Sequence, residues 1–228
     1  MPAIPFVKTL AFDYGAATDV TPLVRRVVAR NPSPFTFHGT GTNIIGRGNV
    51  AVVDPGPDDP EHIDAVLRAV RGETVTHILV THTHSDHVPA APAIARATGA
   101  KIHAFGPHPR PPAGETPEQE GELAFAPDIR LADGDVVEGD GWTVEAVHTP
   151  GHISNHLCFA VREDKALLTG DHVMGWSTAV ISPPDGNMAD YFASLRKLLP
   201  RRETLYIPTH GAEIDRKSTR LNSSHTDI

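Results

Sequence analysis

The feature that most constrains this chain is the cluster His-Thr-His-Ser-Asp-His at residues 82–87. It directly follows a short apolar segment with the composition of a buried β-strand. His82 and His84 are two residues apart, so at the end of a strand their side chains point to the same side and can bind one metal ion. Asp86 and His87, on the turn that follows, can face a second ion. The spacing therefore predicts two metal ions, rather than a surface loop that happens to be rich in histidine.

Three further donors stand at the ends of apolar segments, in similar surroundings of threonine, glycine or proline. They are His152 in Thr-Pro-Gly-His, Asp171 in Thr-Gly-Asp and His210 in Thr-His-Gly. Side chains at the ends of neighbouring strands can converge on one edge of a fold, and glycine lets the backbone turn tightly beside them. We therefore expect these residues to complete the coordination of both ions.

Taken in this order, the four motifs resemble those of the metallo-β-lactamase superfamily of hydrolases over residues 43–211. Residues 31–36 and 39–43, together with His156 four residues after His152, are most similar to the branch that includes the lactamase-like protein 2 hydrolases and, more distantly, glyoxalase II. The resemblance implies an α/β fold, a four-layer αββα sandwich with all the metal donors at one edge of its two sheets.

The resemblance also implies a role for each donor. One metal ion would be held by His82, His84 and His152, the other by Asp86, His87 and His210, and Asp171 would bridge them. Neutral imidazoles and a bridging carboxylate suit two Zn²⁺ ions, with iron or manganese left open.

The only cysteine, Cys158, lies in an apolar run and is expected to be a buried strand residue. True lactamases are best known for a cysteine ligand, so its absence from the motifs argues against a β-lactam substrate.

Two zinc ions about 3.5–4 Å apart would hold a bridging water and lower its pKa toward 7, which gives hydroxide at neutral pH without a side-chain nucleophile. This hydroxide would attack a carbonyl carbon or a phosphorus atom. Asp86 is the predicted catalytic residue, because it would both ligate a metal ion and orient the water. The expected function is therefore a dinuclear metal hydrolase acting on an ester or thioester of a small molecule.

Two other functions stay open. The resemblance allows a single-strand endoribonuclease of the lactamase-like protein 2 type, but such an enzyme needs basic residues near its site, and residues 75–87 contain none. The net charge of −8 also disfavours a nucleic-acid partner. A non-catalytic module stabilised by its metals would surround each ion with four protein ligands, whereas seven donors for two ions leave room for water.

The 228 residues, 39% hydrophobic and 21% charged, fit one globular domain over residues 1–214. Periodic patterns predict a hairpin near residues 43–54, a β-α-β-α-β order up to residue 105, and a second sheet over residues 136–168 before a late amphipathic helix. No apolar signal segment and no stretch near 18 apolar residues is present, so we expect a cytoplasmic protein without membrane contact. The oligomeric state is left open.

The other histidines are not expected to be ligands. His148 and His156 flank the Thr-Pro-Gly-His turn and are expected to bind the outer ring nitrogen of a ligand, while the role of His172 is open. Solvated or structural roles are expected for His38, His62, His77, His103 and His108. The proline-rich segment 106–121 predicts a long loop that can cover the site.

The end of the chain changes character. From Asp215 to His225 the sequence is polar, has no hydrophobic period, and looks like the translation of a common sequencing-library adapter. We therefore expect residues 215–228 to be a disordered artefact that packs against nothing, and His225 not to be a ligand. Hydrolases of the lactamase-like protein 2 branch, which this chain resembles, usually continue into a small helical domain. We therefore also expect the hydrolase domain to be truncated at its C-terminus.

Overall fold

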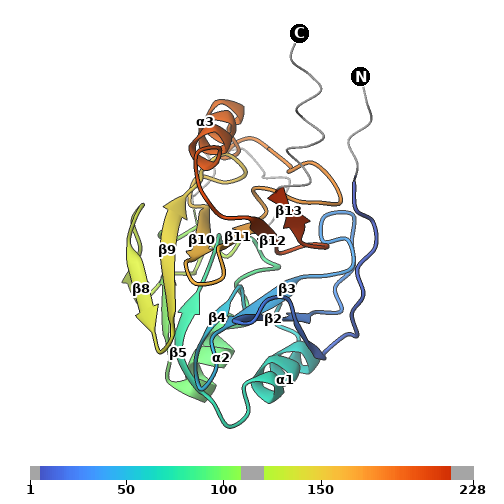
Figure 1. The fold of residues 1–228 in the computed structure, drawn as a ribbon, viewed down its shortest axis with the longest axis vertical. Helices are drawn as coiled ribbons and strands as arrows, with labels where there is room; N and C mark the ends of the chain where they lie inside the picture. The colour runs from blue at the N-terminus through green and yellow to red at the C-terminus, as the bar shows by residue number, and fades with distance from the viewer. Residues whose placement is uncertain (1–5, 109–120, 217–228) are drawn as a thin grey trace.

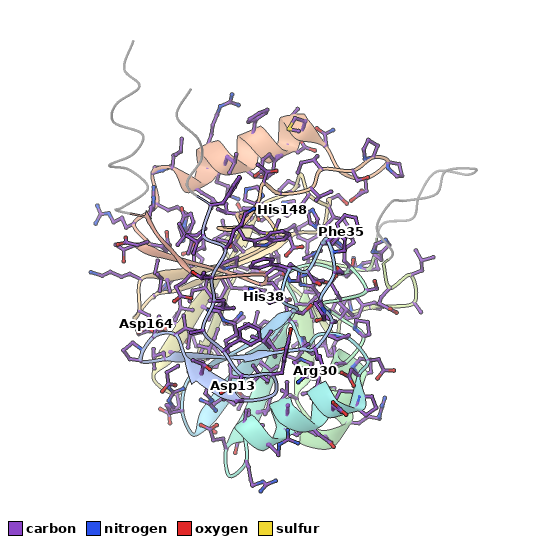
Figure 2. The ribbon with its side chains drawn as sticks, turned by 90° about the vertical axis from the view of Figure 1, so that its right-hand side faces the viewer. Asp13, Arg30, Phe35, His38, His148 and Asp164 are labelled. Carbon is purple, nitrogen blue, oxygen red and sulfur yellow. The ribbon has the colours of Figure 1, made fainter. Side chains whose placement is uncertain are left out.

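The computed structural model describes residues 6–108 and 121–216. Two β-sheets pack face to face, with α1 and α2 on the outer face of one sheet and α3 on the outer face of the other (Figures 1 and 2). Three separate clusters of buried apolar side chains fill the spaces between these layers. The predicted four-layer αββα sandwich is therefore confirmed.

The first sheet has the strand order β1-β2-β3-β4-β5-β6-β7. Its strands are β1 Ala17–Asp19, β2 Val24–Val28, β3 Gly41–Ile45, β4 Asn49–Val53, β5 Thr74–Leu79, β6 Lys101–Ala104 and β7 Ile129–Arg130. Neighbouring strands from β1 to β4 are antiparallel, and those from β4 to β7 are parallel. The parallel order requires crossovers, which α1 (Pro60–Ala69) and α2 (Ala91–Thr98) supply on the outer face.

Local sequence signals explain these elements. The predicted hairpin forms between β3 and β4, with glycines of positive φ at Gly46 and Gly48. Helix α1 begins at Pro60, and the side chain of Asp59 before it accepts a hydrogen bond from the backbone N–H of Glu61 at 3.0 Å. Helix α2 ends at Gly99, which has a φ of 77°. Both predicted helices are therefore confirmed.

The second sheet has the strand order β13-β12-β11-β10-β9-β8. Its strands are β8 Val136–Gly139, β9 Trp142–His148, β10 Leu157–Val161, β11 Ala166–Gly170, β12 Leu205–Pro208 and β13 Ile214–Asp215. Only β11 and β12 pair in parallel, because α3 (Met188–Leu198) crosses between them. The second sheet and the late helix predicted from the sequence are confirmed.

The core also explains the single cysteine. Trp142, Phe159 and Leu79 are among the side chains buried between the two sheets. Cys158 faces the other way and packs with Leu198 of α3. Burial raises the pKa of the Cys158 thiol to about 12, so this thiol is a buried strand residue, as predicted.

Strand β2 was not predicted, because Arg25 and Arg26 interrupt its apolar pattern. Both arginines are nevertheless buried. Arg25 donates to the carbonyl of Gly46 at 3.0 Å and pairs with Glu73. Arg26 donates to the carbonyl of Gly211 and forms an ion pair with Glu213 at 2.8 Å. Partners from distant segments thus offset the cost of burying both charges, and the sequence around β2 contains no sign of them.

The end of the chain corrects one expectation. Asp215 pairs with Leu205 in the second sheet, and the backbone N–H of Arg216 donates to Thr204 at 3.0 Å. The expectation that packing contacts stop at Asp215 is therefore wrong at these two residues. Residues 217–228 lie outside the described part, and the adapter origin of this segment stays a prediction.

Two further expectations concern loops and membranes. Most of the proline-rich segment expected to cover the site, residues 109–120, also lies outside the described residues. Over residues 6–108 and 121–216, no helix has both the length and the apolar character needed to cross a lipid bilayer.

Candidate metal centre

All seven predicted donors lie together at the edge of the sandwich where four strands end. The turn after β5 carries His82, His84, Asp86 and His87. The remaining donors follow β9, β11 and β12, and they are His152, Asp171 and His210. The structure therefore brings together all seven residues that the sequence predicts as donors, and their role as metal ligands remains a prediction.

The first group consists of three buried imidazoles. Nε2 of His82 and Nε2 of His152 each lie 3.0 Å from Nδ1 of His84. Burial, together with the neighbouring histidines, holds the pKa of His82 and of His84 well below the usual value. These rings are neutral at pH 7 and turn nitrogen atoms toward one point, an arrangement that suits a metal cation.

The second group combines two imidazoles with a carboxylate. Oδ2 of Asp86 lies 3.3 Å from Nε2 of His87 and 3.1 Å from Nε2 of His210. Burial alone would lower the pKa of His210, but the charges of Asp171 and Asp86 outweigh it and raise this pKa to about 10. The pKa of His87 is raised well above its usual value for the same reason.

Asp171 lies between the two groups. Its Oδ2 is 3.7 Å from Nε2 of His152, and its Oδ1 is 3.6 Å from Nε2 of His87 and 3.4 Å from Nε2 of His210. Burial would raise the pKa of this carboxyl, but His210 and His87 hold it well below its usual value. A charged carboxylate with one oxygen toward each group has the geometry that a bridging ligand requires.

The outer nitrogens of four rings are each held by an oxygen atom. Nδ1 of His87 donates to Oδ2 of Asp54 at 3.0 Å and Nδ1 of His210 to the carbonyl of Gly39 at 3.1 Å. The remaining two contacts join His152 to the carbonyl of Val180 at 2.6 Å and His82 to the hydroxyl of Thr81 at 3.0 Å. Such contacts turn the inner Nε2 of each ring toward the site, as is usual for metal-binding histidines.

The polar atoms that face the centre test whether a metal fits here. Nε2 of His87, Nε2 of His210 and Oδ1 of Asp171 are buried and meet the geometry of a hydrogen bond with no described residue, although they lie 3.1–3.6 Å from one another or from Oδ2 of Asp86. Without a cation between them, these buried atoms rely on ion pairs alone. Five imidazole nitrogens and two carboxylates form a donor set that fits divalent metal ions.

The raised pKa values predict that metal binding displaces protons. His87 and His210 carry protons in the metal-free protein at neutral pH, whereas a metal ion binds only neutral imidazole. Adding Zn²⁺ near pH 7 should therefore release about two protons per molecule. Affinity should rise with pH up to the pKa of His210 and fall as the solution becomes more acidic. Calorimetric titration in buffers of different ionisation enthalpy measures the released protons.

The His210→Gln variant supplies the control for this prediction, since it removes one of the two protonated rings. It should release about one proton fewer than the unmodified chain. A zinc affinity that does not change with pH would contradict the assignment of protonated rings.

Asp54 is a site residue that the sequence analysis missed. Its Oδ2 accepts from His87 and also from the hydroxyls of Thr81 and Thr209, at 2.8 and 3.0 Å. Its Oδ1 accepts from the backbone N–H of Thr81 at 2.8 Å. Because Thr81 in turn contacts His82, one carboxylate supports a histidine of each group. Its position directly after an apolar strand, followed by Pro-Gly, is the same signal that identified the other donors.

The two histidines beside the Thr-Pro-Gly-His turn differ. His156 is fully buried, and its Nε2 accepts from the backbone N–H of Asp171 at 3.2 Å, so it supports a site residue, but through the backbone and not through the ring nitrogen of a ligand as expected. The prediction is wrong for His148, whose Nε2 contacts the carbonyl of Ser154 and whose ring stacks on Phe105. It lies below α3 in Figure 2, and the alternation of side chains along β9 turns it away from the donors.

His172 is fully buried, and neither of its ring nitrogens has a partner among the described residues. Its ring packs on Tyr191 with the ring centroids 4.8 Å apart. The histidines expected to be solvated or structural are outside the donor groups, as predicted. His62, for example, contacts Thr42 at 2.8 Å and the carbonyl of Pro55 at 3.1 Å.

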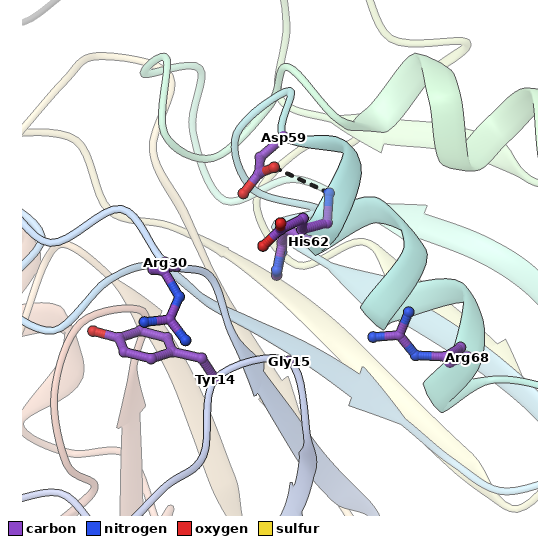
Figure 3. Close-up of a pocket in the computed structure, with 7 residues that line it drawn as sticks. Tyr14, Gly15, Arg30, Asp59, His62 and Arg68 are labelled. Atoms are coloured by element: carbon purple, nitrogen blue, oxygen red, sulfur yellow. Dashed lines mark hydrogen bonds between the residues drawn. The ribbon is translucent and has the colours of Figure 1, made fainter.

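A separate cavity of about 100 Å³ lies beside the start of α1 (Figure 3). The guanidinium of Arg30 lies 4.3 Å from the centre of the Tyr14 ring in its wall. Asp59 and Arg68 also line it, and none of the seven donors does. This cavity is therefore distinct from the candidate metal centre.

Comparison with known families and proteins agrees with this geometry. A profile of the metallo-beta-lactamase superfamily matches residues 40–210. A lactamase-like protein of Aspergillus sp. is 31% identical over 89% of this chain and 59% of its own length. An atrochrysone carboxyl ACP thioesterase of Pseudocercospora fijiensis is 28% identical over the whole chain and 61% of its own length. The chain thus spans about 60% of the length of these curated relatives.

Solved structures share the fold. A beta-lactamase domain protein from Burkholderia ambifaria superimposes with a TM-score of 0.73 at 21% identity, covering 97% of this chain and 75% of its own. ETHE1 from Myxococcus xanthus gives a TM-score of 0.66 at 22% identity, covering 87% of this chain and 81% of its own. At these identities the likeness concerns the fold alone.

Proposed function

Because this chain belongs to the metallo-beta-lactamase superfamily, we propose that it is a metal-dependent hydrolase that cleaves thioesters. The observation that carries the proposal is the convergence of seven potential metal donors on one centre, where three buried polar atoms make no hydrogen bond of good geometry with any described residue. Several relatives near 30% identity are named as thioesterases of acyl carrier protein (ACP), which supports a thioester carried by such a protein as the substrate.

The residues around the centre have distinct tasks in this proposal. Divalent metal ions bound here would polarise the thioester carbonyl and lower the pKa of a water molecule. Hydrolysis adds this water across the bond between carbon and sulfur, so a proton must leave the water and the thiol must leave the acyl carbon. Asp86 is placed to orient that water and to pass its proton on to the leaving thiolate, because its side chain is 25% exposed while His87 and His210 beside it are buried.

The surroundings of Asp86 support this task. The hydroxyl of Thr40 donates to Oδ2 of Asp86 at 3.3 Å, and the side-chain amide of Asn31 donates to the same hydroxyl at 3.0 Å. This chain of contacts orients the carboxylate without closing it off from solvent.

We propose that the centre binds two zinc ions, with iron or manganese as the alternatives. We also propose that the reaction takes place in the cytoplasm.

Metal analysis and a substrate panel test the proposal. We expect the metal-loaded protein to hydrolyse an acyl thioester faster than a phosphodiester, single-stranded RNA or the β-lactam nitrocefin. Removal of metal with a chelator should abolish the activity, and added Zn²⁺, Fe²⁺ or Mn²⁺ should restore it. Metal-loaded protein that cleaves RNA and leaves thioesters intact would replace the proposal with the endoribonuclease alternative.

A further inference from the structure

Helix α3 carries an apolar stripe that the described part of the chain leaves exposed. Met188 is 52% exposed, Phe192 50% and Leu199 63%. At about 100° per residue, these three side chains lie within roughly 40° of one another around the helix. The buried residues of α3, Ser194 and Leu198, lie about a quarter turn or more away. Clustered exposed apolar side chains of this kind mark interaction surfaces more often than scattered ones do.

The same helix ends in a basic segment. Residues 195–202 contain four basic residues and no acidic one, in a chain whose net charge is −8. Lys197 and Arg201 have partners within the domain. Arg196 and Arg202 are exposed, and the structure gives neither of them an ion pair with a described residue. The acidic residue of this helix, Asp190, lies on the side opposite the stripe.

Helix α3 is also directly attached to the candidate metal centre. The hydroxyl of Ser194 donates to the carbonyl of Pro150 at 2.7 Å, in the turn that carries His152. The hydroxyl of Tyr191 donates to the carbonyl of His172 at 3.1 Å, next to Asp171. A partner held on α3 is therefore one helix diameter from the turn that bears a candidate ligand.

We propose that the stripe Met188, Phe192 and Leu199, with Arg196 beside it on the helix and Arg202 shortly after the helix end, is the docking surface for an acidic carrier protein that delivers the acyl thioester. This inference rests on the proposed thioesterase function. An acidic partner with an apolar ridge matches both the basic charge and the apolar character of this surface. The flexible arm of such a carrier would bring the thioester from α3 to the centre.

The test compares one acyl group on two thiols, the phosphopantetheine arm of an acidic acyl carrier protein and free N-acetylcysteamine. The variant Phe192→Ser/Leu199→Ser should raise the KM for the carrier-bound substrate about tenfold or more, a loss of about 1.4 kcal/mol. Turnover of the free thioester should stay within about twofold, because neither side chain belongs to the metal centre. Arg196→Glu should act in the same direction and reduce the dependence of KM on salt.

The matched control is Val136→Ser, which removes a 42% exposed apolar side chain from β8. It should leave KM and turnover unchanged for both the carrier-bound and the free thioester. Equal losses on both thioesters would mean that the stripe serves folding, and unchanged kinetics on both would also overturn the inference. A dimer seen by light scattering and dissolved by the double variant would assign the stripe to a second copy of the chain instead.

Binding of the carrier protein without its acyl group keeps the two proposals apart. Fluorescence anisotropy should detect its binding to the unmodified chain and a weaker binding to Phe192→Ser/Leu199→Ser. Absence of binding overturns the docking surface even if free thioesters are hydrolysed. Specific binding of the carrier protein without hydrolysis of either thioester supports the docking surface and overturns the proposed thioesterase function.

Discussion

Asp86→Ala should lower kcat/KM for thioester hydrolysis by about 10²–10⁴-fold, the range expected when a positioned proton-transfer group is lost. The carboxylate stands beside His87 and His210 and accepts from the hydroxyl of Thr40. Its side chain is 25% exposed and contributes nothing to the apolar clusters. The variant should therefore fold, with a far-UV circular dichroism spectrum like that of the unmodified chain.

Steady-state kinetics with a saturating supply of Zn²⁺ measure this effect. With Zn²⁺ at saturation, weaker metal binding by the variant no longer lowers the rate, so the remaining loss of activity reports the loss of the proton-transfer group. Asp140→Ala, at an exposed turn between β8 and β9, serves as the control and should keep full activity. Full turnover by Asp86→Ala would remove Asp86 from the mechanism.

Asp54→Ala should weaken metal binding by about 10–100-fold, as for other residues that hold a metal-binding histidine. The carboxylate accepts from His87, Thr81 and Thr209, and all of these contacts are buried. Its loss leaves several buried donors unpaired, so the free energy of unfolding should fall by about 3 kcal/mol. Zinc titration against a competing chelator and urea denaturation of the metal-free protein measure the two effects.

The Asp54→Asn variant removes the negative charge of the side chain while keeping a residue that tolerates the backbone conformation of Asp54. Asp54 has a φ of 48°, a left-handed conformation that asparagine also tolerates. The amide oxygen can still accept from the backbone N–H of Thr81, but the amide nitrogen cannot accept from His87. We expect this variant to retain more stability than Asp54→Ala while losing a similar share of metal affinity. Unchanged zinc affinity in both variants would show that Asp54 does not support the centre.

Local signals account for the elements that were predicted correctly. Helix α1 follows an aspartate cap and a proline at its first position, and α2 ends at Gly99, whose positive φ favours glycine. These signals act within a few residues, so the sequence alone contains them. Strand β2 lacks such a signal, because its two arginines are stabilised by residues about 20 to 190 positions away.

In the candidate metal centre, too, some residues could be predicted from local sequence and others could not. His82, His84, Asp86 and His87 belong to one turn, and their spacing predicts a metal site without any knowledge of the fold. His148 and His156 looked equivalent in the sequence. Only the pairing of β9 with β10 and the contact with Asp171 distinguish them.

The sequence by itself determined the α/β architecture and the seven candidate donors, because apolar periodicity, closely spaced histidines and polar residues at strand ends are local properties. The tertiary structure alone decided that Asp54 supports both groups of donors, since its partners follow two other strands, β5 and β12. It also decided which face of α3 is left exposed. Both depend on how distant segments pack, which the order of residues along one segment does not contain.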